Sequence, residues 1–181
     1  MSALLLVLFG FVAIKIWQQF ADGPYGPITG GSFASGTWVD GPVDDWRVLE
    51  GSFDFELVGQ GSSREAGGIL LGEQVYISCD LGFTWARLPE GTTRTVLQII
   101  WWFKDWHHHA VEDGRVVIRK DNTLYPVQIT RVTDPTTVAA LKTTMETLAA
   151  EYFGGELGPR PVEPPNDVWF FAVANRGREP R

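Results

Sequence analysis

The sequence predicts an α+β protein in which an N-terminal transmembrane helix precedes a small β-rich domain with one long amphipathic helix. The first twenty residues are almost entirely apolar. Most of the remaining chain consists of short β-branched and aromatic runs between turn residues, which is typical of strands. One later stretch, 135–153, instead repeats apolar residues every three or four positions, which is typical of a helix.

Length and composition indicate one folded domain besides the N-terminal segment. A chain of 181 residues can build a hydrophobic core, and a net charge of −7 repels phosphate backbones, which argues against nucleic acid as a partner. Cys79 is the only cysteine, so no intrachain disulfide forms, and its apolar neighbours predict burial. The expected division is an anchor at 1–20, a Gly/Pro-rich linker or strap at 21–36, a globular domain at 37–175 and a polar tail at 176–181.

Residues 1–20 match a membrane-spanning helix. Crossing roughly 30 Å of hydrocarbon takes about 20 residues, and the apolar run is interrupted only by Lys15, whose long side chain reaches the interface. The alternative is a cleaved signal peptide, but the segment begins without a basic residue and the cleavage pattern before Ala21 is poor. The residues expected to contact lipid or a neighbouring membrane helix are Phe9, Gly10, Phe11, Ala13, Lys15 and Trp17.

The domain is predicted to be rich in strands. The predicted strands are 53–59, 69–71, 75–79, 115–120, 123–132 and 168–175. Gly72–Gln74 forms the turn of a first hairpin, and Asp121 with Asn122 forms the turn of a second. Pro126 lacks an N–H, so it predicts an edge or a bulge in its strand.

The amphipathic helix is predicted over 135–153. Asp134 can cap it, Pro135 suits its first position, and Gly154 with Gly155 ends it. Its apolar face consists of Val138, Leu141, Met145, Leu148 and Tyr152. The stretch 92–106 fits either a helix capped by Thr92 or Thr93 or a strand, because 96–103 is rich in β-branched and aromatic residues.

Four stretches carry a resemblance to known proteins. They are DGPYGPITGG at 22–31, DDW at Asp44–Trp46, GSSREAGG at 61–68, and KDWHHHAVEDGRVVIRKDNTLYPVQITRVTD at 104–134. With them the chain resembles a family of uncharacterised bacterial proteins that have an N-terminal membrane anchor. The resemblance implies a single-pass protein of the bacterial inner membrane and transfers no catalytic residue. Because an N-terminal anchor usually exports the chain that follows it, we expect the domain in the periplasm.

The predicted hairpins and helix are also similar to the split barrel of the pyridoxamine phosphate oxidase group, which implies a flavin-binding oxidoreductase as an alternative function. A flavin phosphate requires cationic and backbone donors. The only close basic cluster is Arg115, Arg119 and Lys120, and at most Arg115 and Arg119 share a face of their strand. We therefore expect no cofactor.

The run His107–His109 contains every histidine of the chain and is the candidate for a metal site. His107 and His109 share a face only if this piece is extended, and Glu112 and Asp113 then add oxygen ligands. The alternative interpretation is a polar, partly exposed turn, because consecutive side chains diverge. We favour the turn and expect no metal.

The remaining residues show no catalytic pattern. Ser62 and Ser63 have no neighbouring histidine and are predicted to lie in a solvated loop. Trp101, Trp102 and Trp106 are either core residues or a surface for a partner. The sequence therefore predicts no enzyme but an accessory or scaffold subunit, bound to the bilayer and to other integral membrane subunits, for example in a respiratory or photosynthetic complex.

Overall fold

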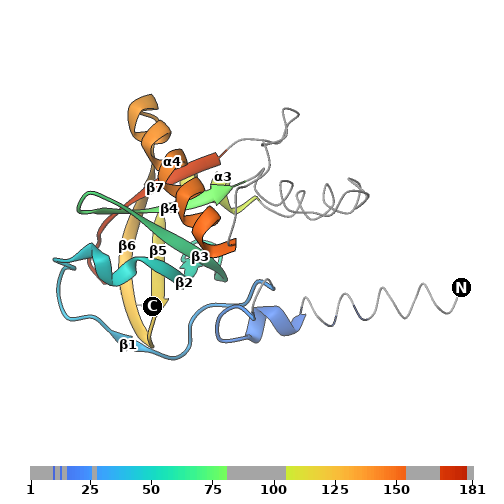
Figure 1. Ribbon diagram of the computed structural model, residues 1–181. Coiled ribbons are helices and arrows are strands. Elements are labelled where there is room, and N and C mark those ends of the chain that lie inside the picture. The colour runs from blue at the N-terminus through green and yellow to red at the C-terminus, as the bar shows by residue number, and fades with distance from the viewer. Residues whose placement is uncertain are drawn as a thin grey trace, which may run out of the picture.

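The computed structural model describes residues 10, 13, 16–25, 28–80, 105–153 and 168–178 (Figure 1). Within these ranges the chain forms a small α+β domain, as the sequence predicts. Most of the predicted anchor lies outside them, as do 92–104 and the predicted helix stop at Gly154 and Gly155. Among the helices that are described, none has the length and apolar character that crossing a membrane requires.

Six antiparallel strands close into a barrel. They are β2 (Gly51–Leu57), β3 (Ser62–Leu71), β4 (Gln74–Asp80), β5 (Arg115–Lys120), β6 (Thr123–Arg131) and β7 (Val168–Asn175). The order around the barrel is β6-β5-β2-β3-β4-β7, and β7 pairs again with β6. The short β1 (Thr37–Trp38) lies parallel to the start of β6. A 3-10 helix, Trp46–Leu49, precedes β2.

The hairpin between β5 and β6 confirms the predicted turn. Asp121 and Asn122 have φ values of 49° and 63°, as a tight two-residue turn requires. Pro126 pairs with Val117 of β5. On the other side of β6, the pairing with β1 ends at Leu124 and the pairing with β7 begins at Val127, so Pro126 lies between them. Its missing N–H is therefore tolerated at a local edge.

The predicted loop at Ser62 and Ser63 is wrong, because both residues belong to β3, which begins well before the predicted run 69–71. Ser63 is completely buried, and its hydroxyl donates to the carbonyl of Gly31 at 2.6 Å. The polar residues Ser62–Glu65 conceal this strand in the sequence, since Arg64 lies on the inner face opposite Phe55 and Ser63 is covered by the strap.

Alternate side chains of the strands fill the barrel. Phe55, Ile77, Ile118, Ile129 and Phe171 are among the fully buried residues that meet inside. Two further elements complete this cluster: α3 (Trp106–Glu112), through Trp106 and Ala110, and the 3-10 helix, through Leu49. Cys79 also lies here and is buried, in line with the expectation from its neighbours.

The long helix α4 (Pro135–Phe153) lies across the outside of the barrel next to β3 and β7 (Figure 1). Asp134 caps it by accepting from the N–H of Thr137 at 2.7 Å, as predicted. Leu141 and Met145 are buried against Phe170. Leu148 is 40% exposed, which corrects the predicted apolar face. It lies two turns, about 10 Å, beyond Leu141 along the helix.

Residues 28–36 run along the outside of the barrel wall, and we call this segment the strap. Phe33 is buried in a cluster with Val117 and Leu124, and Trp38 packs against the same cluster. Gly30 exchanges two backbone hydrogen bonds of 2.9 Å with Ser63 of β3. The strap therefore covers the outer faces of three strands and brings the N-terminal segment to a fixed point on the domain.

Candidate functional site

An ion-pair network closes the strap onto the wall formed by β2 and β5. Asp22 accepts from the N–H of Ala34 at 2.7 Å and from the hydroxyl of Ser35, and it pairs with Arg119 at 2.9 Å. Arg119 also pairs with Asp54 of β2 at 3.1 Å. The Arg119 side chain is only 16% exposed, so these contacts are partly shielded from water. One arginine thus connects the N-terminal segment to two strands.

The network holds the carboxylate of Asp22 in its charged form. Burial acts to raise the pKa of Asp22, but the hydrogen bonds from Ser35 and Ala34 and the charge of Arg119 outweigh it and lower the pKa below its ordinary value. A second carboxylate, that of Glu56, is buried under the strap and accepts the N–H of Phe33 at 2.9 Å.

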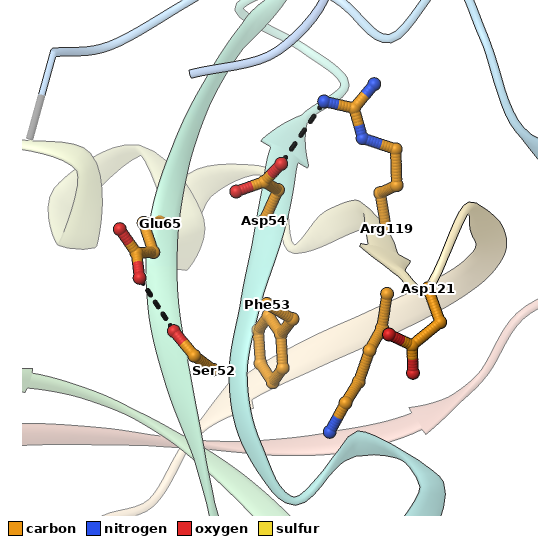
Figure 2. A pocket seen from close by; sticks show the side chains of 7 residues that line it. Ser52, Phe53, Asp54, Glu65, Arg119 and Asp121 are labelled. Atoms are coloured by element: carbon orange, nitrogen blue, oxygen red, sulfur yellow. Dashed lines mark hydrogen bonds and ion pairs between the residues drawn. The ribbon is translucent and has the colours of Figure 1, made fainter. Parts of the chain in front are cut away.

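A shallow pocket of about 230 Å³ opens beside this network. Figure 2 shows its lining residues, which are Ser52, Phe53, Asp54, Glu65, Arg119, Lys120 and Asp121. Its polar groups largely bond to one another: Ser52 donates to Glu65 at 2.7 Å, and Arg119 pairs with Asp54 (Figure 2). Lys120 donates to the carbonyl of Glu50. The charges of the pocket therefore serve mainly to join strands, the strap and the chain before β2.

The structure places Arg115 and Arg119 on the same face of β5, as the strand period predicts, but it does not leave both free for a phosphate. Arg115 pairs with Asp113 at 2.7 Å, and this contact is the main cause of the lowered pKa of Asp113. Arg119 pairs with two carboxylates. The basic cluster considered for a flavin phosphate is thus neutralised within the chain.

The histidines lie on the helix α3, so the favoured interpretation as a polar turn is wrong, and the extended segment that a shared metal face requires is not formed either. Consecutive helical residues are about 100° apart. His107 is buried, with its ring 4.7 Å from that of Trp169. His109 lies at the surface between Asp105, at 3.7 Å, and Glu112, at 3.8 Å. Within the described ranges, no group of three or more His, Cys, Asp or Glu residues is arranged to hold a metal ion.

Trp106 is a core residue and does not form the partner surface considered for it. It is 3% exposed, and its ring centroid lies 5.0 Å from Phe55 and 5.4 Å from Phe171. Trp101 and Trp102 lie outside the described residues. Trp106 is the first residue of the short helix α3, which packs against the barrel interior.

The predicted membrane contacts are described only in part. Gly10 and Ala13 are helical, and no heavy atom lies within 4 Å of a Cβ built on Gly10. Trp17 is 53% exposed in the helical segment 16–20. Phe9, Phe11 and Lys15 are outside the described residues. The described contact residues are therefore open to a neighbour in this structure.

Sequence reasoning missed the partners of Asp22 and the position of Arg64. Asp22 and Arg119 are 97 positions apart, and no local pattern links them. Arg64 stands in β3 on the face that points into the barrel, opposite Phe55. The strand period would have indicated this if β3 had been predicted to begin at Ser62.

No protein-family model matches this chain, and no curated protein is significantly similar to it.

Proposed function

We propose that this chain is a non-catalytic accessory subunit of a membrane protein complex, anchored by residues 1–20 in the bacterial inner membrane. The observation that supports this is the distribution of exposed large apolar side chains. Five of the eight among the described residues fall within 16–28, namely Ile16, Trp17, Phe20, Tyr25 and Ile28. Phe20 is 83% exposed and Tyr25 is 74% exposed. Such a concentration is typical of a surface that meets lipid or a partner.

The composition of this exposed set favours a lipid interface. Tryptophan and tyrosine are enriched where a membrane meets water, and the apolar run of residues 3–14 directly precedes them. Asp22 follows Phe20 by two positions and is held by Arg119. The barrel is therefore attached at a short, fixed distance from the anchor, in contrast to a domain on a long flexible linker.

In this proposal the barrel lies on the periplasmic side and presents its surface to integral membrane subunits. Gly10 and Ala13 provide small side chains where a neighbouring helix can approach closely. The barrel acts as a scaffold that positions its partners and performs no reaction itself.

Membrane attachment is tested by fractionating bacteria that express the full chain. We expect the protein in the membrane fraction after an alkaline carbonate wash and in solution only after detergent. A double variant, Leu6→Arg with Phe9→Arg, is expected to leave the membrane, because each buried charge costs about 2.5–3.5 kcal/mol. Val48→Arg, at an exposed position of the domain, is the matched control. Recovery of the wild type in the aqueous fraction after gentle lysis would contradict the anchor.

The side of the membrane is tested separately by adding protease to spheroplasts. Digestion of the barrel in intact spheroplasts is expected if it is periplasmic. Protection until the membrane is permeabilised would place the barrel in the cytoplasm and correct this part of the proposal.

Association with other subunits is tested on native gels in mild detergent. We expect the wild type to migrate with a larger assembly and Gly10→Leu to migrate alone with its domain folded. Gly177→Leu is the matched control, since a Cβ there also meets no atom within 4 Å. Migration of the wild type as a monomer would contradict the accessory role and leave the anchor intact.

A second candidate function, a cofactor-binding split barrel, is favoured by the closed barrel of six antiparallel strands. Its predicted phosphate contacts, Arg115 and Arg119, are engaged with carboxylates. The visible absorption spectrum of the purified protein discriminates the two functions. Stoichiometric flavin absorbance would favour the oxidoreductase, and a colourless protein is expected from the accessory subunit.

A further inference from the structure

Arg64 carries a positive charge into the interior of the barrel. It pairs across β2 and β3 with Phe55, which lies in the central cluster, so both side chains occupy the inner face. Its guanidinium carbon is 5.9 Å from the ring centroid of Phe55 and 6.0 Å from that of Trp106. Burial of a charge costs several kcal/mol unless an opposite charge and hydrogen bonds compensate.

The contacts of Arg64 provide little compensation. Nη2 donates to the hydroxyl of Ser62 at 3.3 Å, whereas the buried Nε has no acceptor in the described part of the chain. Burial lowers the pKa of Arg64, although Asp105 and Cys79 act to raise it. Asp105 exerts this effect from beyond ion-pair distance, and its side chain is 63% exposed. Among the described residues, the guanidinium therefore has most of its five N–H donors and its charge unmatched.

The backbone pairing of β3 with β4 does not extend to Arg64 in the described part of the chain. In the described part of the chain, β3 pairs with β4 only from Gly68 to Leu71, opposite Gln74 to Ile77. The earlier half of β3 bonds to β2 and, at Ser63, to the strap. Arg64 itself is only partly buried. Part of the Arg64 side chain is therefore accessible to solvent.

The neighbouring end of the barrel adds cationic and aromatic groups. The guanidinium of Arg131 stacks 3.4 Å from the ring centroid of Trp169, and this ring contacts His107. His107 in turn lies next to Trp106, which borders Arg64. Of the charged groups named at this end, Arg64 and Arg131 are cationic and Asp105 is anionic, so the balance favours a negatively charged ligand over a cation.

We propose that Arg64 binds the oxyanion of a small ligand, a carboxylate or a phosphate, through the exposed part of its side chain. The planar guanidinium offers parallel N–H donors that match two oxygens of either group. The remaining Nη donors supply these bonds, while Phe55 and Trp106 lie beside the guanidinium as apolar neighbours. The ligand balances the charge that the chain leaves unbalanced.

The experiment titrates the detergent-solubilised full chain with inorganic phosphate or with succinate, at constant ionic strength maintained with sodium chloride. Two signals are followed: the thermal unfolding midpoint and the intrinsic fluorescence, to which the adjacent Trp106 contributes. A ligand that binds the folded state raises the midpoint as its concentration passes the Kd. We expect a saturable rise with at least one probe, and the probe that binds identifies the oxyanion as a phosphate or a carboxylate.

Three variants locate the site. Arg64→Met is expected to abolish saturation, Arg64→Lys to weaken it at least tenfold because an ammonium cannot bind two oxygens in parallel, and Arg115→Met to leave it unchanged. Absence of saturation in the wild type with both probes would overturn the proposal, as would unchanged binding in Arg64→Met. If Arg64→Met does not fold while Arg64→Lys folds and binds like the wild type, Arg64 is a structural residue and the proposal also fails.

Discussion

Arg119 and Arg64 lie on different walls of the barrel and differ in how their charges are balanced. Arg119, on the outer face of β5, lies 4.3 Å from the ring centroid of Phe33 and pairs with Asp22 and Asp54. Arg64, on the inner face of β3, also lies beside aromatic rings but has no described carboxylate within ion-pair distance. Among the described residues, the first charge is balanced by two carboxylates and the second has no carboxylate at ion-pair distance.

The difference separates a structural site from a binding site. A balanced pair that is partly shielded from water stabilises the contact it joins, here the strap on the wall of the barrel. An unbalanced buried charge destabilises the fold, so its presence indicates a purpose other than stability. The two walls therefore predict opposite responses to the removal of their arginines.

The largest expected effect concerns the aromatic wall beside Arg64. Trp106→Ala removes a ring that is 3% exposed and contacts Phe55 and Phe171, and truncation of such a residue costs about 3–5 kcal/mol of unfolding free energy. Urea unfolding followed by circular dichroism measures the change. Trp17→Ala, at a position that is 53% exposed, is the matched control. Equal costs at the two tryptophans would mean that Trp106 does not form this wall.

The next prediction concerns the apolar contact between α4 and the barrel. Leu141→Ala should cost about 2–5 kcal/mol, because Leu141 is fully buried between α4 and the barrel. Leu148→Ala, on the same helix but 40% exposed, should cost far less. Both are measured by the same unfolding experiment. A similar loss at the two leucines would show that the last turns of α4 are also packed against the barrel.

The smallest expected effect is the pH dependence of the balanced wall. Because the folded state lowers the pKa of Asp22 below its ordinary value of 3.8, the stability from its charged form is present above that value and is lost as the pH falls through the lower folded pKa. Asp22→Asn should flatten the acid side of the stability curve, measured as unfolding free energy from about pH 5 downward. Asp45→Asn, at an exposed carboxylate, is the control. Identical acid slopes in wild type and Asp22→Asn would contradict the network.

Local patterns predicted much of the fold. The alternation of 115–132, its turn at Asp121 and the capped helix after Asp134 all lie in the structure close to the predicted positions. These signals are local, since they depend on residues within a few positions of one another. The first half of β3 was missed, because its polar residues include Ser63, which is buried by the strap, and Arg64, which lies on the inner face of the barrel.

The sites could not be predicted in the same way. Asp22 meets Arg119 only after the barrel closes, and Arg64 is recognised as buried only when β3 has its correct start. The histidine run is a metal-site candidate by composition, but its residues lie in the helix α3, where consecutive side chains point in different directions. Side chains that are distant in sequence and joined by the sheet register leave no local signature.

The account is tested most directly by the unfolding free energies of Arg64→Met and Arg119→Met, measured side by side without added oxyanion. Arg119→Met should lower stability by about 1–2 kcal/mol, since it leaves Asp22 and Asp54 without their shared partner at a partly exposed site. Arg64→Met should leave stability unchanged or raise it, because the methionine side chain has a similar shape and lacks the unbalanced charge. A loss at Arg64→Met equal to or greater than that at Arg119→Met would contradict the distinction between the two walls.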